Sequence, residues 1–139
     1  MEKQVRYTLN KDDRLKSRKA IEYLFKDGKS FSIFPLRILY MINTASEKPP
    51  SNLRAGFSVS TRNFKKAVNR NRIKRLLREA YRLQKHLLAE QIEAADKALI
   101  VFFIYTGNEL PDYKTIEEKT QASIKRLQKI LHENNIANT

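Results

Sequence analysis

The spacing of apolar residues divides the chain into alternating helical and extended segments. Ser17 and Gly28 are typical of the two ends of a short helix. Between them, Ile21, Leu24 and Phe25 have the i, i+3, i+4 spacing of one apolar helix face. From this spacing alone we expect Phe25 to belong to the core.

Three extended segments follow this helix. Residues 31–34 form a short strand that Pro35 interrupts, as at a sheet edge or a bend. Residues 36–43 form a firmer strand. One side of this strand carries Leu36, Ile38, Tyr40 and Ile42. The other side carries Arg37, Leu39, Met41 and Asn43.

The third extended segment, residues 54–60, has faces of different character. Phe57 and Val59 point to one side, whereas Gly56, Ser58 and Ser60 point to the other. Because small and polar side chains bury little apolar area, the second side is predicted to stay open to solvent or to a ligand. An exposed loop, residues 44–53, precedes this strand.

A long amphipathic helix is predicted from residue 62 to residue 85, fading near 88–93. At about 100° per residue its apolar residues fall on one side of the helix. They are Ile73, Leu76, Leu77, Ala80, Leu83 and Leu87. The opposite side carries Asn71, Lys74, Arg75, Arg78, Arg82 and Lys85, flanked by Arg70 and Arg72.

The last part of the chain predicts one strand and one helix. Residues 99–105 are apolar without alternation, as in a strand covered on both faces. Residues 113–131 form a helix in which Thr115 and Glu118 have the spacing of a capping box. Its apolar stripe is Ile116, Ile124, Leu127 and Leu131, and its outer face is Glu117, Glu118, Gln121, Lys125 and Lys129.

This order of elements predicts an α+β fold. We expect one small sheet with the two long helices on the same face, and with the first helix partly covering the other face. The chain of 139 residues is expected to be a single domain. Residues 1–16 resemble a loose basic arm, and we expect 1–12 and 133–139 to be flexible.

Charge points to a polyanionic partner. The chain has 28 Lys and Arg against 15 Asp and Glu, and the 24 residues of 62–85 contain ten of the bases and one acid, Glu79. Within this segment Arg70–Lys74, Lys74–Arg78 and Arg78–Arg82 are like-charged i, i+4 pairs, which disfavour an isolated helix. A helix face that accepts such repulsion favours nucleic acid as its partner.

An anionic membrane surface is the competing polyanion. The chain has no run of about 18 apolar residues and no signal peptide, and the apolar side of the basic helix lacks the aromatic anchors of interfacial helices. We therefore expect no membrane partner. Cysteine is absent, which excludes disulfides and thiolate sites and makes the cytoplasm the expected location.

Groups for catalysis or metal binding are sparse. His86 and His132 are the only histidines and stand far apart. The adjacent pairs Asp12–Asp13 and Glu117–Glu118 point apart on regular backbone, and no glycine-rich phosphate loop is present. If the protein takes part in a hydrolytic reaction, we expect its partner to supply the catalytic groups, with no metal or cofactor held by this chain.

One motif resembles a known family. Ser58-Val59-Ser60, followed by the run from Lys66 to Glu79 (K-A-V-N-R-N-R-I-K-R-L-L-R-E), is similar to the protein subunit of bacterial ribonuclease P. The resemblance extends over roughly residues 10 to 132. Many members have Gly-Asn before the Ala-Val, where this chain has Lys65-Lys66.

This resemblance implies a fold and a function. The implied order is αβββαβα, with a mostly antiparallel four-stranded sheet and a left-handed crossover, although physical priors favour a right-handed one. The implied function is removal of the 5′ leader from precursor tRNA, in which the RNA subunit carries the catalytic centre with Mg²⁺. The protein would act as a monomer that binds this RNA and the leader.

Two sets of residues receive roles from the pattern and the resemblance together. The set expected to bind the RNA subunit is Lys65, Lys66, Arg70, Asn71, Arg72, Lys74, Arg75, Arg78 and Arg82. The set expected in a leader-binding cleft is Ile21, Phe25, Tyr40, Ser58, Ser60 and Arg62. Ile21 stands where many relatives have a second Phe, which weakens stacking there, and Glu79 is expected to orient Arg75 or Arg82.

Two other functions remain open at this point. One is a stand-alone structural or regulatory nucleic-acid-binding protein, associated with the ribosome or placing its helix in a DNA groove. The other is an intrinsic nuclease, which the few candidate catalytic groups disfavour.

Overall fold

The protein is described from a computed structural model, which covers residues 13–44 and 52–137, with side chains as far as Asn134. The predicted flexible segment 1–12 lies outside the described residues. The elements are α1 (Arg18–Asp27), β1 (Lys29–Ile33), β2 (Leu36–Thr44), β3 (Leu53–Val59), α2 (Ala67–Gln84), α3 (His86–Ala95), β4 (Lys97–Tyr105) and α4 (Tyr113–Ala137). The predicted order is therefore correct except that two helices, not one, connect β3 to β4.

A single four-stranded sheet in the order β1-β2-β4-β3 forms the middle layer. The β1–β2 and β2–β4 pairs are antiparallel, whereas β3 and β4 are parallel, so the sheet is mixed. Parallel neighbours need a long connection, which α2 and α3 provide. The left hand expected for this crossover remains a prediction from the resemblance.

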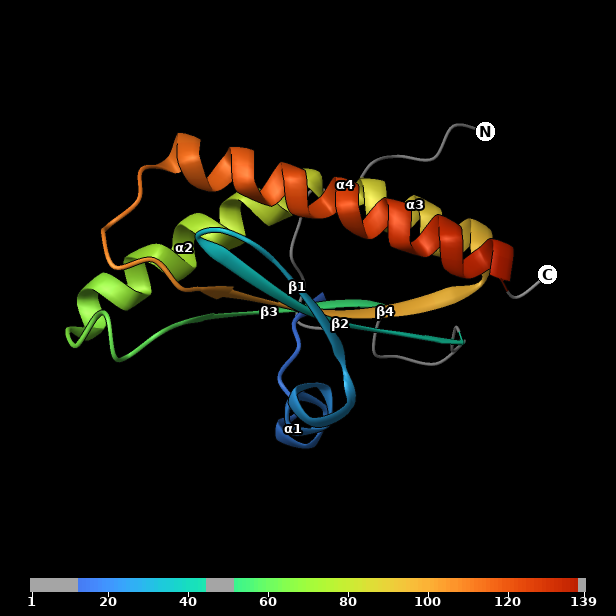
Figure 1. Cartoon of the computed structure of the whole chain (residues 1–139), viewed down its shortest axis with the longest axis horizontal. Coiled ribbons are helices and arrows are strands. Elements are labelled where there is room, and N and C mark those ends of the chain that lie inside the picture. Colours follow the sequence, from blue (N-terminus) through green and yellow to red (C-terminus); the bar gives the residue numbers. More distant parts are fainter. Residues whose placement is uncertain (1–12, 45–51, 138–139) are drawn as a thin grey trace.

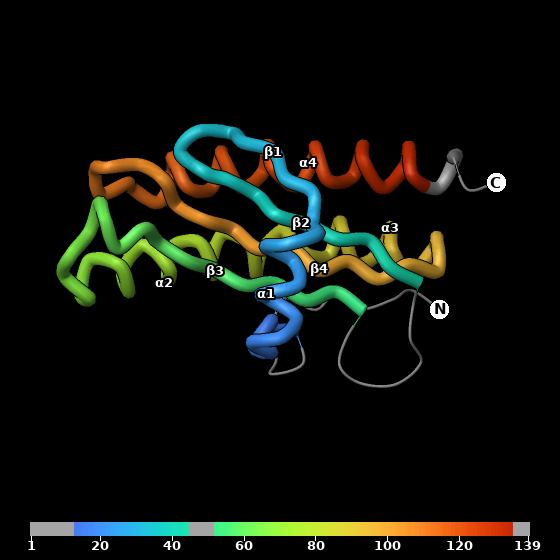
Figure 2. Tube along the Cα trace, turned by 60° about the horizontal axis from the view of Figure 1, so that its bottom comes forward, coloured from blue at the N-terminus to red at the C-terminus, as the bar shows by residue number. Residues whose placement is uncertain are grey.

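The predicted distribution of helices on the two faces is confirmed. Figure 1 shows the sheet edge-on, with α2, α3 and α4 above it and α1 below. In Figure 2 α1 lies in front of the strands and the other helices behind them. We call the side under α2, α3 and α4 the covered face and the side under α1 the open face.

The main core fills the covered face. Leu36, Ile38 and Leu99 are completely buried there together with Phe103. Phe103 stacks on Phe57 with ring centroids 5.6 Å apart. The predicted α4 stripe of Ile116, Ile124, Leu127 and Leu131 also belongs to this cluster.

A smaller core lies under α1. Ser17 caps this helix, since its hydroxyl accepts a hydrogen bond from the Ala20 N–H at 3.3 Å, and the helix stops before Gly28 as predicted. Leu24 is buried against Leu39 and Phe102. The alternation predicted for β2 is confirmed, because Leu39 faces α1 whereas Leu36 and Ile38 face the covered side.

The basic helix differs from its prediction at both ends. It begins at Ala67 rather than residue 62, and it breaks at Lys85, after which α3 starts. Tyr81 is buried on its inner side, although the pattern did not assign it there. Leu83 and Leu87, predicted to be buried, are 39% and 37% exposed. The buried arc is rotated because α2 packs against α4 as well as the sheet.

Lys85 and the segment 13–15 correct two further expectations. Lys85 is buried rather than part of the charged outer face, and its Nζ donates to Asp13 Oδ2 at 3.1 Å. The end of the predicted loose arm is ordered, since the Leu15 N–H donates to the Ala55 carbonyl at 2.9 Å and Leu15 is buried. These contacts attach residues 13–15 to β3 and to the α2–α3 junction.

The last helix is capped differently and is longer than predicted. Asp112 Oδ1 accepts the Thr115 N–H at 2.8 Å, so Asp112, and not a Thr115–Glu118 box, satisfies the helix start. Hydrogen bonding from Thr115, first through its side chain and then through this backbone N–H, lowers the pKa of the Asp112 carboxyl. The helix continues to Ala137, beyond the predicted end at residue 131, and the flexibility expected from residue 133 stays a prediction.

Candidate nucleic-acid interface

The outer side of α2 is a polar surface that faces away from the sheet. Ile73, Leu77 and Ala80 are completely buried, which fixes the rotation of the helix and turns the remaining positions outward. The outward side chains are Asn71, Arg72, Arg75, Arg78 and Glu79, with Lys74 and Arg82 partly covered. We call Asn71, Arg72, Lys74, Arg75, Arg78 and Arg82 the basic face of α2.

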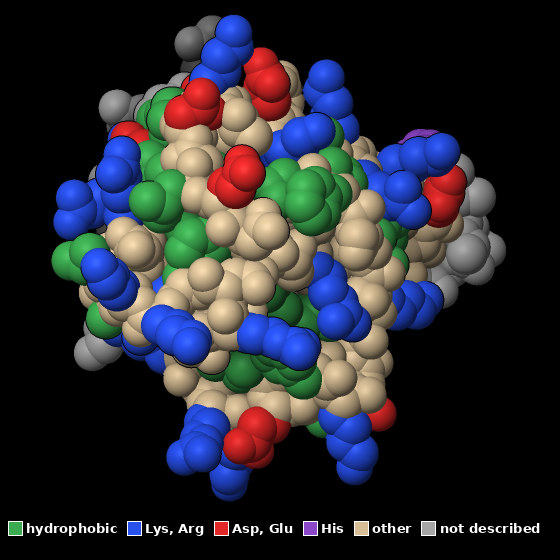
Figure 3. Space-filling view, turned by 60° about the vertical axis from the view of Figure 1, so that its left-hand side comes forward, with side chains coloured by type: hydrophobic (Ala, Val, Ile, Leu, Met, Phe, Trp, Pro, Cys, Tyr) green, Lys and Arg blue, Asp and Glu red, His purple; other side chains and the backbone are tan. Residues whose placement is uncertain are grey.

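The loop of residues 61–66 joins the end of β3 to this helix. Arg62, Lys65 and Lys66 are exposed, whereas Phe64 is buried, with its ring centroid 6.0 Å from that of Tyr105. Figure 3 views the molecule from the left of Figure 1, where Lys and Arg side chains are spread around small apolar patches. The loop thus adds three cations beside the basic face of α2.

Arg70 is placed differently from the other predicted RNA-binding residues. Its Nη1 donates to the backbone carbonyls of Phe64 at 2.8 Å and Lys65 at 2.7 Å. The guanidinium is therefore turned back toward the loop. The sequence pattern put Arg70 at a flank of the charged face and gave no indication of this contact.

Glu79 orients Arg82, one of the two partners predicted for it. Arg82 Nη2 lies 2.6 Å from Glu79 Oε1, and Nε donates to Oε2 at 3.1 Å. The hydrogen bond from Arg82 lowers the pKa of Glu79, and the same bond raises that of Arg82. Glu79 therefore holds the guanidinium of Arg82 in place. As a negative group, it is not itself a ligand for a polyanion.

Next to α1, part of the open face stays uncovered. Paired positions of the four strands place Ser32, Arg37, Ile104 and Ser58 in one row on this side. Ser32 and Arg37 are exposed, and Ser58 and Ile104 are partly buried. The row is a shallow polar and apolar surface between α1 and the ends of the strands.

Phe25 borders this surface and is not a core residue. Its side chain is 52% exposed, and its ring meets Phe102 edge-on at a centroid distance of 5.4 Å. Phe102 in turn lies over Gly56, where an added Cβ would be 2.6 Å from the ring. Glycine at this position therefore lets Phe102 lie flat as the floor beneath Phe25.

Tyr40 does not belong to this surface, which corrects its predicted place in the cleft. It lies on the covered face, is 8% exposed, and has its ring centroid 5.9 Å from that of Phe31. Burial raises the pKa of its hydroxyl, while the positive charge of Arg126 acts in the opposite direction. The alternation of β2 had already placed Tyr40 beside Leu36 and Ile38, and that reading was the correct one.

The other cleft residues lie around the open face, and one was missed. Ile21 is partly buried on α1, Ser60 directly follows β3, and Arg62 is exposed in the next loop. Arg37 was missed, although it shares the strand side of Leu39 that alternation assigned to the open face. It provides a cation in the row between Ser32 and Ile104.

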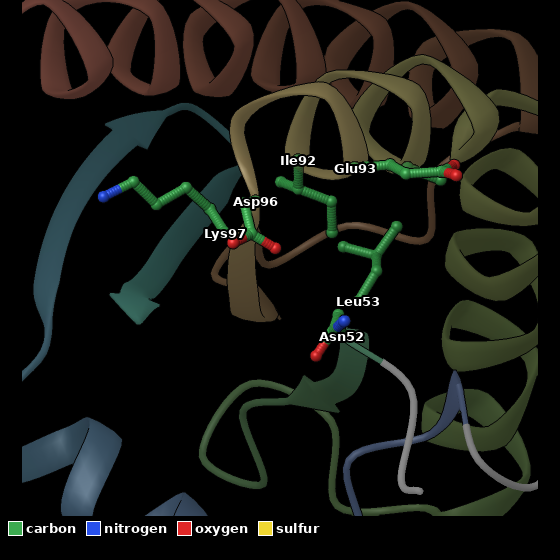
Figure 4. Close-up of a pocket in the computed structure, with 7 residues that line it drawn as sticks. Asn52, Leu53, Ile92, Glu93, Asp96 and Lys97 are labelled. Atoms are coloured by element: carbon green, nitrogen blue, oxygen red, sulfur yellow. The ribbon is translucent and has the colours of Figure 1, made fainter. Parts of the chain in front are cut away.

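A pocket at the far end of the sheet has a different character. It has a volume of about 350 Å³ and lies between the start of β3, the end of α3 and the start of β4. Figure 4 shows Glu93 and Lys97 extending in different directions from it. Its charged groups do not converge on one point, so it is a poor candidate for a catalytic site.

The described part of the chain holds no cluster of three or more His, Cys, Asp or Glu suited to a metal ion. Among the same residues, no helix has the length and apolar character needed to span a bilayer.

Comparisons with known proteins agree with the geometry. The Ribonuclease P family profile matches residues 9–128. The ribonuclease P protein component from Porphyromonas gingivalis is 38% identical over 121 residues, which cover 87% of each chain. The one from Chlorobaculum tepidum is 30% identical over 129 residues, which cover 89% of this chain and 82% of the relative. The solved ribonuclease P protein from Thermotoga maritima is similar with a TM-score of 0.61 and 28% identity, covering 81% of this chain and 96% of that one. The chain belongs to the ribonuclease P protein family.

Proposed function

We propose that this protein subunit of ribonuclease P uses two surfaces for two RNAs. The basic face of α2, with Lys65 and Lys66, binds the RNA subunit, and the open face of the sheet holds the 5′ leader of precursor tRNA. The protein thereby assists the endonucleolytic removal of the leader. The observation that carries this proposal is the loop of residues 61–66, which connects the cationic helix directly to the open face.

Each surface has the chemistry that its RNA needs. The exposed guanidinium groups of Arg72, Arg75 and Arg78 suit phosphate oxygens, because the planar fork donates two hydrogen bonds at once. On the open face, the exposed ring of Phe25 offers a stacking surface for an unpaired base. Arg37, Ser58 and Arg62 supply polar contacts to the backbone of a single strand.

The catalytic groups belong to the RNA subunit in this proposal. Mg²⁺ would be held by that RNA, since the described side chains of this protein form no suitable cluster. The protein acts as a monomer within the ribonucleoprotein, without a membrane partner. We place it in the cytoplasm, because a chain without cysteine has no disulfide that would require an oxidising compartment. A stand-alone nucleic-acid-binding role is not favoured, since the relatives reported above are ribonuclease P proteins.

The proposal is tested by reconstitution. Purified protein is mixed with a ribonuclease P RNA and precursor tRNA at low Mg²⁺, and the rate of 5′ cleavage is measured. We expect stimulation by the wild-type protein and a clear loss of it in Arg75→Ala/Arg78→Ala. The matched control is Lys125→Ala/Lys129→Ala, which removes the same charge from the outer face of α4 and should preserve stimulation.

Two outcomes would contradict the proposal. Absence of stimulation by the wild-type protein would remove the subunit role. Cleavage by the protein without RNA would instead support the intrinsic nuclease that the sequence left open.

A further inference from the structure

The loop of residues 61–66 has no regular secondary structure, yet side-chain hydrogen bonds hold it at Asn63 and at the next two residues. Asn63 Nδ2 donates to the carbonyls of Thr106 and Gly107 at 3.2 and 3.1 Å. Arg70 Nη1 donates to those of Phe64 and Lys65 at 2.8 and 2.7 Å. The loop is therefore attached to the segment after β4 on one side and to the first turns of α2 on the other.

Backbone contacts of Ser60 and the buried ring of Phe64 add to these two attachments. The Ser60 N–H donates to the Tyr105 carbonyl at 3.4 Å, and the Phe64 N–H donates to the Ser60 carbonyl at 3.2 Å. Phe64 itself is buried. Because Phe64 points inward, its neighbours Arg62, Lys65 and Lys66 are left on the solvent side.

The start of α2 depends on Arg70 for a second reason. Its N-cap position is Lys66, which makes no capping hydrogen bond with its side chain, although helix starts usually rely on Ser, Thr, Asp or Asn there. Arg70 instead reaches back one turn to the two carbonyls that precede the cap. A hydrogen bond from a charged donor is stronger than a neutral one, so this contact defines the path of the chain into the helix.

We propose that Arg70 and Asn63 are positioning residues that hold the loop so that Arg62, Lys65 and Lys66 meet RNA as a preformed group. Arg70 then acts mainly through the loop, and the phosphate contacts are made by its neighbours. The advantage is entropic, because a loop that is already ordered loses less conformational freedom on binding. The inference has a structural half, that the two residues hold the loop, and a functional half, that the held loop meets RNA. Only the functional half rests on the proposed binding of the RNA subunit.

The structural half is tested on the free protein. Amide hydrogen exchange of residues 61–66 is compared in wild type, Asn63→Ala, Arg70→Ala and the control Arg75→Ala, which removes the same charge from the same helix. We expect exchange to rise by about tenfold or more in the first two variants and to stay at the wild-type rate in the control. Unchanged exchange in both Asn63→Ala and Arg70→Ala would overturn the proposal.

The functional half is tested by the salt dependence of binding to the RNA subunit. Each lost phosphate contact flattens the slope of log K against log salt by about 0.7 to 0.9. Arg75→Ala should lose about one contact and Arg70→Ala more than one. Asn63→Ala should also flatten the slope, although it removes no charge. In the double variant Asn63→Ala/Arg70→Ala the slope should flatten by less than the sum of the changes in the two single variants, because the two residues hold one loop.

The two measurements separate the possible failures. A wild-type slope for Asn63→Ala, with Arg70→Ala equal to Arg75→Ala, would make Arg70 an ordinary phosphate ligand and overturn the positioning role. If the wild-type protein binds no RNA subunit, the proposed function fails, and hydrogen exchange still decides whether the loop is held as described. Cooperative thermal unfolding of every variant confirms that altered binding does not reflect loss of the fold.

Discussion

Phe102 and Phe103 are neighbours on β4 and show how differently the two faces of the sheet are used. Phe103 is completely buried, with the rings of Phe57 and Tyr81 each at a centroid distance of 5.6 Å. Phe102 lies on the open face, where its main aromatic contact is the half-exposed Phe25. One strand therefore supplies a closed core on one side and the floor of an accessible surface on the other. A single step along the chain therefore separates the main core from the smaller cluster that borders the open face.

The largest expected effect is the loss of stability when a ring is removed from the covered face. Phe103→Ala leaves a cavity among rings that cannot collapse, so we expect the free energy of unfolding to fall by about 3–5 kcal/mol. Urea denaturation followed by circular dichroism measures this loss.

Phe102→Ala is the matched control for this stability change. Phe102 is also buried, but in the smaller cluster under α1, so we expect a smaller loss of stability together with weaker binding of leader-bearing precursor tRNA. Equal destabilisation by both substitutions would show that the two faces contribute alike to stability, and it would contradict the difference between the faces described above.

A smaller effect is expected from the rim of the open face. Phe25→Ala removes a stacking ring that contributes about 1–3 kcal/mol per base, or roughly 5- to 150-fold in affinity for leader-bearing precursor tRNA. Affinity for mature tRNA should stay the same, because it has no leader. Titration of both RNAs into the reconstituted holoenzyme measures the difference.

Tyr40→Phe is the corresponding control on the covered face. It keeps the buried ring and removes only the hydroxyl, so leader affinity should remain at the wild-type value. A selective loss of leader affinity in Tyr40→Phe would return this residue to the leader site and contradict its placement here.

The smallest effect is expected on the outer surface of α2. The hydrogen bond to Arg82 lowers the pKa of Glu79 below its ordinary value of 4.5, so the pair stabilises the fold at neutral pH. This contribution disappears as the pH falls through the lowered pKa. Glu79→Gln should therefore be slightly less stable than wild type at pH 7, and this difference should be smaller at pH 3. Urea midpoints at both values test this, and an equal difference at the two pH values would exclude the ion pair as its cause.

Local signals in the sequence were sufficient for much of the fold. The Ser17 cap, the Gly28 stop and the α4 stripe depend on residues within a few positions of each other, so they can be recognised without knowing the sheet. Long-range packing was not accessible in this way. Leu83, predicted to be buried, is exposed, and Tyr81, to which the pattern gave no environment, is buried, because α4 covers one flank of α2. Nothing within the helix indicates which flank that is.

The candidate site was predictable in composition but not in arrangement. The charged residues of α2 were identified because their spacing is regular, whereas the contact of Arg70 with two carbonyls depends on a loop path that the sequence does not define. Tyr40 was misplaced because the resemblance was given more weight than the alternation of β2. The same alternation would have revealed Arg37, had its shared side with Leu39 been followed to the open face.

The position of β4 has a consequence for how the chain assembles during synthesis. β4 is the last strand along the sequence, yet it lies between β2 and β3. A nascent chain that has not reached Tyr105 therefore holds β2 and β3 without the strand that joins them. Its basic helix emerges after β3 but before α4, and it packs against both. Domains are generally completed as units during translation, and here the unit closes only when its central strand leaves the ribosome. Until α4 has followed, the positively charged segment lacks one of the two elements that cover its apolar side.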